Sequence, residues 1–193
     1  AALGDLAAAE IHRRHRSLTI MAHSTGGLVT SLWAAQRLGV VDGLVLNSPW
    51  LAMQGSDLVQ AVGAQIMAGL GSVLSTNALP VKDTGLYARA MHASQDGEWD
   101  YDLTLKTSPS QPIRAGWMRA ILAGHQRIMT GLDIEVPVLV MCSTRSVVRR
   151  TWDPVLQECD SVLNADQIAR RAHKLGSVVT IVNPSRRTSA AIS

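Results

Sequence analysis

The chain has 193 residues, of which 47% are hydrophobic, and it carries a formal net charge of +3. This length can enclose one buried core, and the composition excludes an intrinsically disordered chain. No uninterrupted apolar run reaches the roughly 18 residues of a membrane span, and no signal peptide is expected. The positive charge is divided among short basic clusters that have no recognition motif, so we expect no nucleic-acid partner.

Cys142 and Cys159 are the only cysteines in the sequence. They lack the paired spacing of a zinc site, and no cluster of other ligand residues accompanies them. The sequence therefore predicts no metal and no cofactor. Two cysteines are compatible with a reducing compartment, and we expect a cytoplasmic protein, with a single disulfide as the alternative.

Hydrophobic periodicity predicts alternating helices and strands from the start of the chain. Residues 3–14 have the spacing of an amphipathic helix, and residues 17–22 form a short apolar run typical of a buried strand. Helical spacing resumes over 28–38 and stops at a glycine, and 43–47 is a second apolar run. A strand, a helix and a strand with short connections form a right-handed parallel unit, whose ligand site lies beyond the carboxyl ends of the strands.

The alternation is interrupted over residues 51–112, where a loosely helical stretch at 58–74 precedes a segment rich in Ser, Thr, Asp, Gly and Pro. It then returns, with helices predicted over 113–132 and 165–175, strands over 136–142 and 177–182, and a polar tail over 183–193. We therefore predict one α/β domain over residues 1–193, with a mostly parallel sheet flanked by helices.

Ser24 stands at the corner between the first predicted strand and the helix after it. The residues two before and two after it, Ala22 and Gly26, are small, as a sharp turn requires, and Gly27 lets the helix lie close to the strand. Such a turn lifts a serine hydroxyl clear of the sheet, and the N–H of Thr25 points toward a developing oxyanion. Ala22 departs from the usual glycine. The alternative is an ordinary turn in which Ser24 only caps the helix.

The residues around this turn resemble those of a known family. Residues 22–27 (Ala-His-Ser-Thr-Gly-Gly) and 44–49 (Leu-Val-Leu-Asn-Ser-Pro) are similar to the α/β-hydrolases, and most to the branch with lysophospholipases, monoacylglycerol lipases and serine aminopeptidases. The resemblance continues to about Val182. It implies a partial α/β-hydrolase fold and a serine hydrolase that cleaves ester or peptide bonds of a small acyl or lipid-like substrate, through an acyl-enzyme at Ser24.

The resemblance also implies a helical lid-like insertion over about 51–112. It implies strands before the first residue of this chain, so we expect the chain to be N-terminally incomplete, a fragment. Four methionines are candidates to line a flexible apolar acyl pocket, although filling of the core is the favoured interpretation. They are Met53, Met67, Met91 and Met118.

In this fold an acid follows the nucleophile along the chain, and a histidine comes last. After the strand at 136–142, the candidates for the acid are Asp153 and Asp160. Asp153 precedes a proline and fits the N-cap of a short turn, whereas Asp160 is expected to have no capping role, because Asn164 precedes the next helix. Order and resemblance favour Asp160 as the acid, with Asp153 and a purely structural aspartate as alternatives.

The histidine that would complete a triad is missing from its expected place. Residues 183–193, after the last predicted strand, contain no histidine. His23 adjoins the nucleophile, but its ring lies at the strand end, and in the resembled family a histidine at this place is common and is not the base. His92 and His125 are the remaining alternatives for a base.

Two functions remain open. The first is a serine hydrolase impaired by the missing base, whose loss from a triad costs on the order of 10⁶ in kcat. The second is a non-catalytic fragment or pseudoenzyme that keeps the fold and an apolar pocket. Nucleotide binding is excluded, because Thr-Gly-Gly at 25–27 is too short for a phosphate loop and neither G-K-[ST] nor G-x-G-x-x-G occurs.

Overall fold

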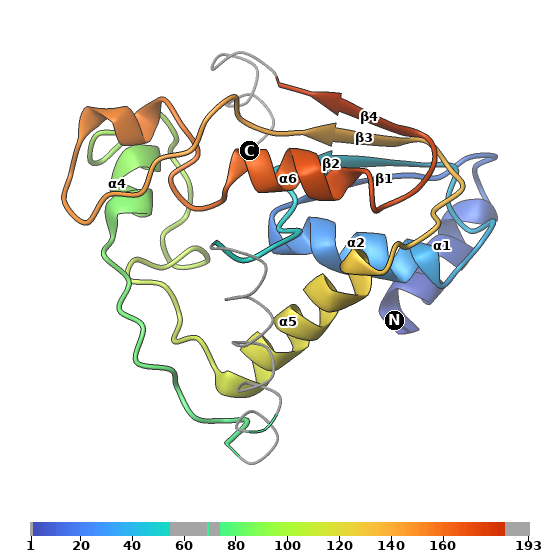
Figure 1. Cartoon of the computed structure of the whole chain (residues 1–193), viewed down its shortest axis with the longest axis horizontal. Coiled ribbons are helices and arrows are strands. Elements are labelled where there is room, and N and C mark those ends of the chain that lie inside the picture. The colour runs from blue at the N-terminus through green and yellow to red at the C-terminus, as the bar shows by residue number, and fades with distance from the viewer. Residues whose placement is uncertain (1, 55–68, 70–73, 184–193) are drawn as a thin grey trace. The chain divides into compact units, whose positions relative to one another are not determined.

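The computed structural model describes residues 2–54, 69 and 74–183, which are coloured in Figure 1. Most of the predicted helical stretch at 58–74, Met67, and the tail beyond residue 183 lie outside the described residues. The chain forms two compact units. The sheet unit comprises Ala1–Met53, Gly124–Thr144 and Ala165–Ser193, and the second unit comprises Gln54–Ala123 and Arg145–Asn164. One domain over residues 1–193 stays a prediction.

The sheet unit contains a parallel four-stranded sheet with the strand order β1-β2-β3-β4 (Figure 1). Its strands are β1 (Thr19–His23), β2 (Gly43–Asn47), β3 (Val138–Met141) and β4 (Val179–Val182). The sequence predicted all four, β2 with these bounds and the others within two residues at each end. Because the strands are parallel, their carboxyl ends meet at one edge of the sheet, where β1 leads into Ser24.

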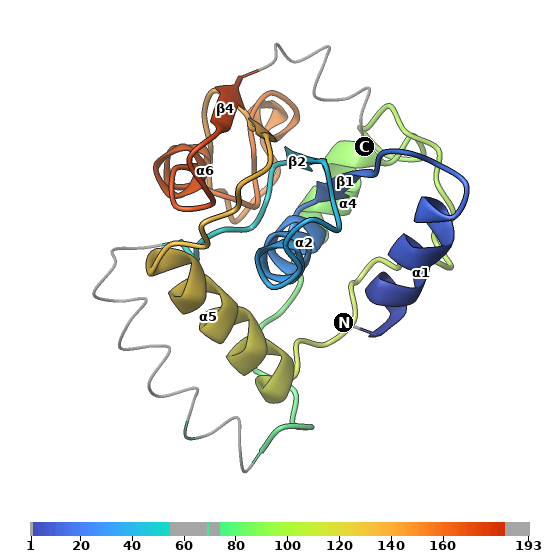
Figure 2. The ribbon, with the colours of Figure 1, turned by 90° about the vertical axis from the view of Figure 1, so that its right-hand side faces the viewer.

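The core of the sheet unit lies between the sheet and its helices. Leu44 and Leu46 of β2 pair with Val138 and Val140 of β3, and all four side chains are at most 2% exposed. Helix α2 (Thr25–Ala35) packs on β1 and helix α6 (Ala165–Ala172) packs on β4. Figures 1 and 2 show both helices on the same face of the sheet. Burying branched apolar side chains from two central strands provides the main stabilisation of this unit.

Helix α2 begins and ends three residues earlier than the predicted range of 28–38. It starts directly after Ser24, because both glycines of the turn are already part of its first turn. Its end is early because the amides of Gln36 and Arg37 donate to carbonyls only three residues back, which tightens the last turn. Gly39 follows with a φ of 73°, a conformation that favours glycine.

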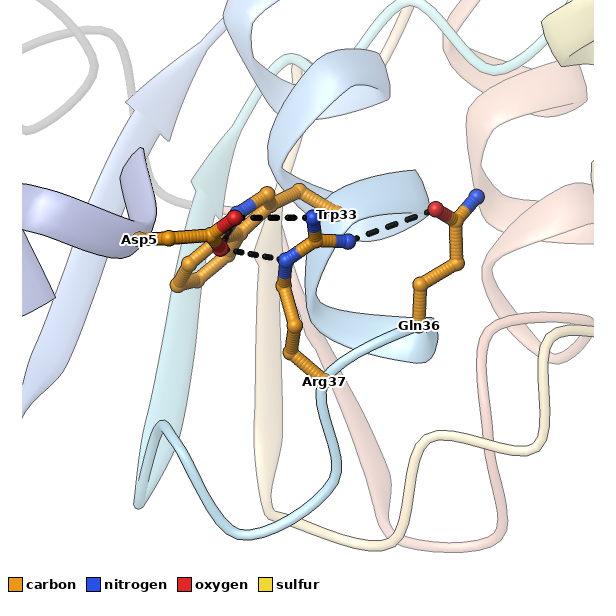
Figure 3. Close-up of polar contacts among 4 residues, drawn as sticks. All are labelled: Asp5, Trp33, Gln36 and Arg37. Carbon is orange, nitrogen blue, oxygen red and sulfur yellow. Dashed lines mark hydrogen bonds and ion pairs between the residues drawn. The ribbon is translucent and has the colours of Figure 1, made fainter. Parts of the chain in front are cut away.

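Three further predicted helices are present, each shorter than its predicted range. They are α1 (Ala2–His12), predicted over 3–14, α5 (Ala115–Met129), predicted over 113–132, and α6, predicted over 165–175. Asp5 of helix α1 accepts hydrogen bonds from Nε1 of Trp33 in α2 at 3.0 Å and from Nη2 of Arg37, just after α2, at 2.9 Å (Figure 3). The hydrogen bond from Arg37 holds the pKa of Asp5 below its ordinary value.

The second unit contains two short elements, of which the sequence predicted only the turn that Asp153 caps. Helix α4 (Leu86–Met91) contacts the 3₁₀ helix η1 (Pro154–Gln157), and the guanidinium of Arg89 lies 4.2 Å from the ring centroid of Trp152. Helix α4 has six residues, too few to give a periodic pattern, which explains why the sequence did not predict it.

Met118 is 8% exposed, in agreement with core filling. Most of the predicted lid interval lies in the second unit.

Gly27 and Gly26 provide a matched pair of substitutions at the start of α2. A β-carbon on Gly27 would lie 2.6 Å from Cβ of Pro49 and 3.0 Å from its Cα, whereas one on Gly26 would meet only Cβ of Ala22, at 3.9 Å. We expect Gly27→Ala to lower the free energy of unfolding by about 1–3 kcal/mol, because Pro49 and the backbone must shift. Gly26→Ala is expected to raise it by up to about 1 kcal/mol, since alanine favours the helix. Urea unfolding measures both, and equal effects would contradict this packing.

Candidate active site

Ser24 lies between β1 and α2 in a backbone conformation that residues other than glycine rarely adopt. Its φ is 51° and its ψ is −121°. Such a conformation costs on the order of 1–3 kcal/mol and persists only where the surroundings hold it. The side chain of Ser24 makes no capping hydrogen bond to α2. The alternative in which this serine only caps the helix is therefore wrong.

Three hydrogen bonds hold the main chain of Ser24. Its N–H donates to the carbonyl of Asn47 at 3.1 Å, and its own carbonyl accepts from Gly27 at 3.0 Å and from Trp50 at 2.9 Å. Asn47 ends β2 and Trp50 lies in the loop after it, so the loop after one strand fixes the turn after its neighbour. A β-carbon on Gly26 would lie 3.9 Å from Cβ of Ala22, so these two small residues approach each other across the turn.

The hydroxyl of Ser24 belongs to a partly exposed residue at the N-terminus of α2. The first N–H groups of a helix have no partner within the helix, and they favour negative charge. Thr25 is the first residue of α2, so its N–H is one of these groups. A partly exposed serine next to such an N–H is one of the features found at sites of acyl transfer.

His23 is directed toward the neighbouring strand. Its Nδ1 lies 3.1 Å from the carbonyl oxygen of Asn47 and 3.3 Å from the side-chain Nδ2 of the same residue. A protonated Nδ1 donates to the carbonyl, and an unprotonated one accepts from the amide. Either tautomer uses Nδ1 at the end of β2, which agrees with the expectation that His23 is not a base for its neighbour.

The expectation that Asp160 has no capping role is wrong. Its Oδ1 accepts the N–H groups of Val162 at 2.9 Å and Leu163 at 2.6 Å, so the carboxylate caps the turn that follows it. An aspartate forms such a turn without a helix behind it, which is why a helix-based argument missed it. Asp160 belongs to the second unit, whereas Ser24 belongs to the sheet unit.

Asp153 has the role that the sequence predicted. Its Oδ1 accepts the N–H of Val155 at 2.9 Å at the start of η1, and Pro154 occupies the first helical position. Both candidate acids therefore cap a turn, and capping does not distinguish them. The choice of Asp160 rests on chain order and resemblance alone.

Neither alternative histidine exposes a basic nitrogen. His92 is 6% exposed, with Nδ1 2.8 Å from Oγ of Ser94 and Nε2 3.1 Å from the carbonyl oxygen of Tyr101. His125 is 4% exposed, and its Nε2 lies 2.8 Å from the carbonyl oxygen of Trp50. Burial lowers the pKa of His125 to about 4, so the ring is neutral at pH 7.

A shallow groove of about 600 Å³ lies between α1 and the C-terminal end of α2. Asp5, His12 and Arg37 are among its lining residues. Helix α2 has 11 residues and therefore separates this end from Ser24 by about 16 Å. The groove does not serve the turn at Ser24.

The described residues contain no metal-binding cluster, no disulfide and no membrane-spanning helix. Within residues 2–54, 69 and 74–183, no three His, Cys, Asp or Glu side chains gather as ligands for a metal ion, and neither cysteine forms a disulfide. No helix in this part of the chain has the length and apolar character needed to cross a bilayer.

Residues 3–151 match the family model of serine aminopeptidase, S33. No curated protein matches the chain. Among solved structures, the fold is similar to a monoacylglycerol lipase from Paleococcus ferrophilus, with 15% identity and a TM-score of 0.60, over 100% of this chain and 74% of that one.

Two further solved structures are similar in fold. A soluble variant of monoglyceride lipase from Saccharomyces cerevisiae, in complex with a substrate analog, has 13% identity and a TM-score of 0.58, over 96% of this chain and 59% of that one. A metagenome-derived lipolytic enzyme has 14% identity and a TM-score of 0.55, over 93% and 60%. This chain thus spans about three fifths of the length of these two proteins. The chain belongs to the serine aminopeptidase S33 family and has part of the α/β-hydrolase fold, a parallel sheet flanked by helices.

Proposed function

We propose that the chain is a serine hydrolase with Ser24 as its nucleophile and with reduced activity. The observation that carries the proposal is the positive φ of Ser24, at the corner between β1 and α2, maintained by hydrogen bonds from the loop after β2. Strain of this kind is kept where a side chain must be presented, and a serine presented beside a helix N-terminus is suited to attack a carbonyl.

The proposed reaction is acyl transfer. Oγ of Ser24 forms a bond to the carbonyl carbon of the substrate and gives its proton to solvent water, because no base is assigned, and the N–H of Thr25 stabilises the oxyanion. Collapse of the tetrahedral intermediate breaks the bond to the leaving group, which takes a proton from solvent and departs as an alcohol or amine. Water then hydrolyses the acyl-enzyme. Asp160 is the acid that would orient a base. Ala22, His23, Gly26 and Gly27 shape the turn.

The proposed substrate is a small acyl or lipid-like ester. Support comes from the names of the similar structures, which include a monoacylglycerol lipase and a monoglyceride lipase. The family name keeps peptide bonds as the alternative. Residues in the interval 51–112 act as a lid in this proposal. The cysteines, which form no disulfide in the described residues, suit the cytoplasm in which we place the protein.

The proposed reduction in activity concerns a base that is not found among the residues of this sequence. Residues 183–193 contain no histidine, and the rings of His92 and His125 are buried and hydrogen-bonded. Losing the base of a serine triad costs on the order of 10⁶ in kcat and leaves roughly 10³–10⁴ over the reaction in water. We therefore expect slow acylation of Ser24 rather than rapid turnover.

Covalent labelling by a fluorophosphonate tests the role of Ser24. The parent chain is expected to form one covalent adduct, and Ser24→Ala is expected to lower the labelling rate at least 100-fold, because this reagent phosphonylates only an activated hydroxyl. Ser177→Ala provides the control, because Ser177 is exposed and lies before β4. Equal labelling of the two variants would contradict the proposal.

A second candidate is a non-catalytic protein that keeps the fold. The absence of a histidine from residues 183–193 favours it. This candidate predicts a folded chain in which Ser24 reacts no faster with a fluorophosphonate than Ser177 does.

A further inference from the structure

One buried histidine contacts the loop that holds the turn at Ser24. His125 lies on α5, and its Nε2 donates a hydrogen bond of 2.8 Å to the main-chain carbonyl of Trp50. Since a carbonyl only accepts, the proton of the neutral ring must be on Nε2. The lone pair is then on Nδ1, which is buried and has no hydrogen-bond partner among the described residues.

Trp50 connects this histidine to Ser24. Its carbonyl accepts from His125, and its N–H donates to the carbonyl of Ser24 at 2.9 Å. The indole and imidazole rings also meet edge to face, with centroids 5.4 Å apart and planes at 72°. The N–H of Trp50 is thus hydrogen-bonded to the turn at Ser24, and its carbonyl is hydrogen-bonded to His125 of α5.

The position of α5 makes this contact possible. A β-carbon on Gly124 would lie 3.0 Å from Cδ1 of Leu32, so α5 approaches α2 closely at the residue before His125. The close approach of the two helices brings the ring of His125 within hydrogen-bond distance of the Trp50 carbonyl, and the ring supplies one donor to it.

We propose that His125 is a positioning residue, which holds Ser24 in its positive-φ conformation through the main chain of Trp50. This inference rests on the proposed function for its catalytic meaning, but the contact itself can be tested without any reaction. His125 touches no substrate, and its role is to keep the Trp50 N–H directed at the Ser24 carbonyl.

Two substitutions of His125 by neutral amide side chains distinguish the roles of the two ring nitrogens. In His125→Gln the side-chain NH₂ group takes the place of Nε2, and in His125→Asn it takes the place of Nδ1. Hydrogen exchange of the Trp50 amide, followed by NMR, reports the bond to Ser24 directly. We expect protection of this amide to fall at least 10-fold in His125→Asn and to stay within 3-fold of the parent in His125→Gln, while the amide of Val140 in β3 serves as the reference for global unfolding.

The same variants are then labelled with the fluorophosphonate. We expect the labelling rate of Ser24 to fall at least 10-fold in His125→Asn and to be restored in His125→Gln, with His173→Leu as an exposed control. If protection of the Trp50 amide is lost in both His125→Asn and His125→Gln, or in neither variant, the positioning role is overturned. An unlabelled parent chain would instead overturn the proposed function and leave the exchange result to decide the role of His125. If both variants lose labelling of Ser24 while His125→Gln keeps protection of the Trp50 amide, His125 would act as a base. This result would also overturn the inference.

Discussion

A single histidine introduced after β4 is expected to raise the rate at which Ser24 is labelled by roughly 10²–10⁴-fold, the usual contribution of general acid–base catalysis. The native residues 183–193 contain no histidine, and the fold places its base after the last strand. An imidazole within reach of Oγ would accept the proton that Ser24 loses on attack. Eight variants, each with one histidine at a position from 183 to 190, are compared by their second-order labelling rates at pH 8.

The fastest of these variants also identifies the acid. Adding Asp160→Asn is expected to remove at least 10-fold of the gain, because the new imidazole loses the carboxylate that orients it. Adding Asp153→Asn, which removes the charge but keeps a side-chain oxygen able to cap η1, is the control and should leave the gain intact. If none of the eight variants gains labelling rate, more than a base is missing from the chain. If Asp153→Asn removes the gain and Asp160→Asn does not, Asp153 is the acid.

The free energy of unfolding is expected to fall by about 3 kcal/mol between pH 6.5 and pH 4 through His125 alone. The pKa of this ring is about 4 in the folded chain, against 6.5 for an unperturbed histidine. Between these values the unfolded chain binds a proton that the folded chain does not, so stability decreases as the pH falls. Each unit of difference contributes about 1.4 kcal/mol, and the loss levels off over about one pH unit below pH 4, where the folded chain also becomes protonated.

His125→Gln isolates this effect, because it keeps a donor near Trp50 and removes the titrating ring. Two other groups act on the ring. The carbonyl of Trp50 raises its pKa and the charge of Arg171 lowers it, but burial dominates. The pKa values of Asp5, Asp83 and Asp102 are also lowered. The stabilisation that these carboxylates give to the folded chain is lost at acid pH, equally in the parent and in His125→Gln. Urea unfolding at pH 7, 6, 5 and 4.5 should show curves that diverge as the pH falls, and parallel curves would place His125 in a more hydrated environment.

Local rules predicted the part of the site that is formed by consecutive residues. Small residues on both sides of Ser24 predicted the turn, because its geometry depends only on how closely the chain can approach itself. The strand over residues 43–47 was predicted with its observed bounds, since an apolar run between turn residues has clear limits. The start of α2 was placed too late, because two glycines usually indicate a turn and here belong to the first turn of a helix.

Contacts between distant residues could not be predicted in this way. The bond between His125 and Trp50 joins positions 75 residues apart, and no periodicity indicates it. A helical pattern placed His125 on a helix but did not reveal its partner. The turn at Asp160 was missed for a different reason, because its side chain bonds to amides two and three residues ahead without any helix.

The proposed acyl transfer requires Ser24 to be a nucleophile rather than a strained structural serine. Mass spectrometry of the folded parent chain after treatment with a fluorophosphonate, followed by trypsin digestion, tests this most directly. The reagent should be found on the peptide of residues 17–37, and fragmentation should assign it to Ser24. A folded chain that carries no adduct, or an adduct on a different residue, would contradict the account.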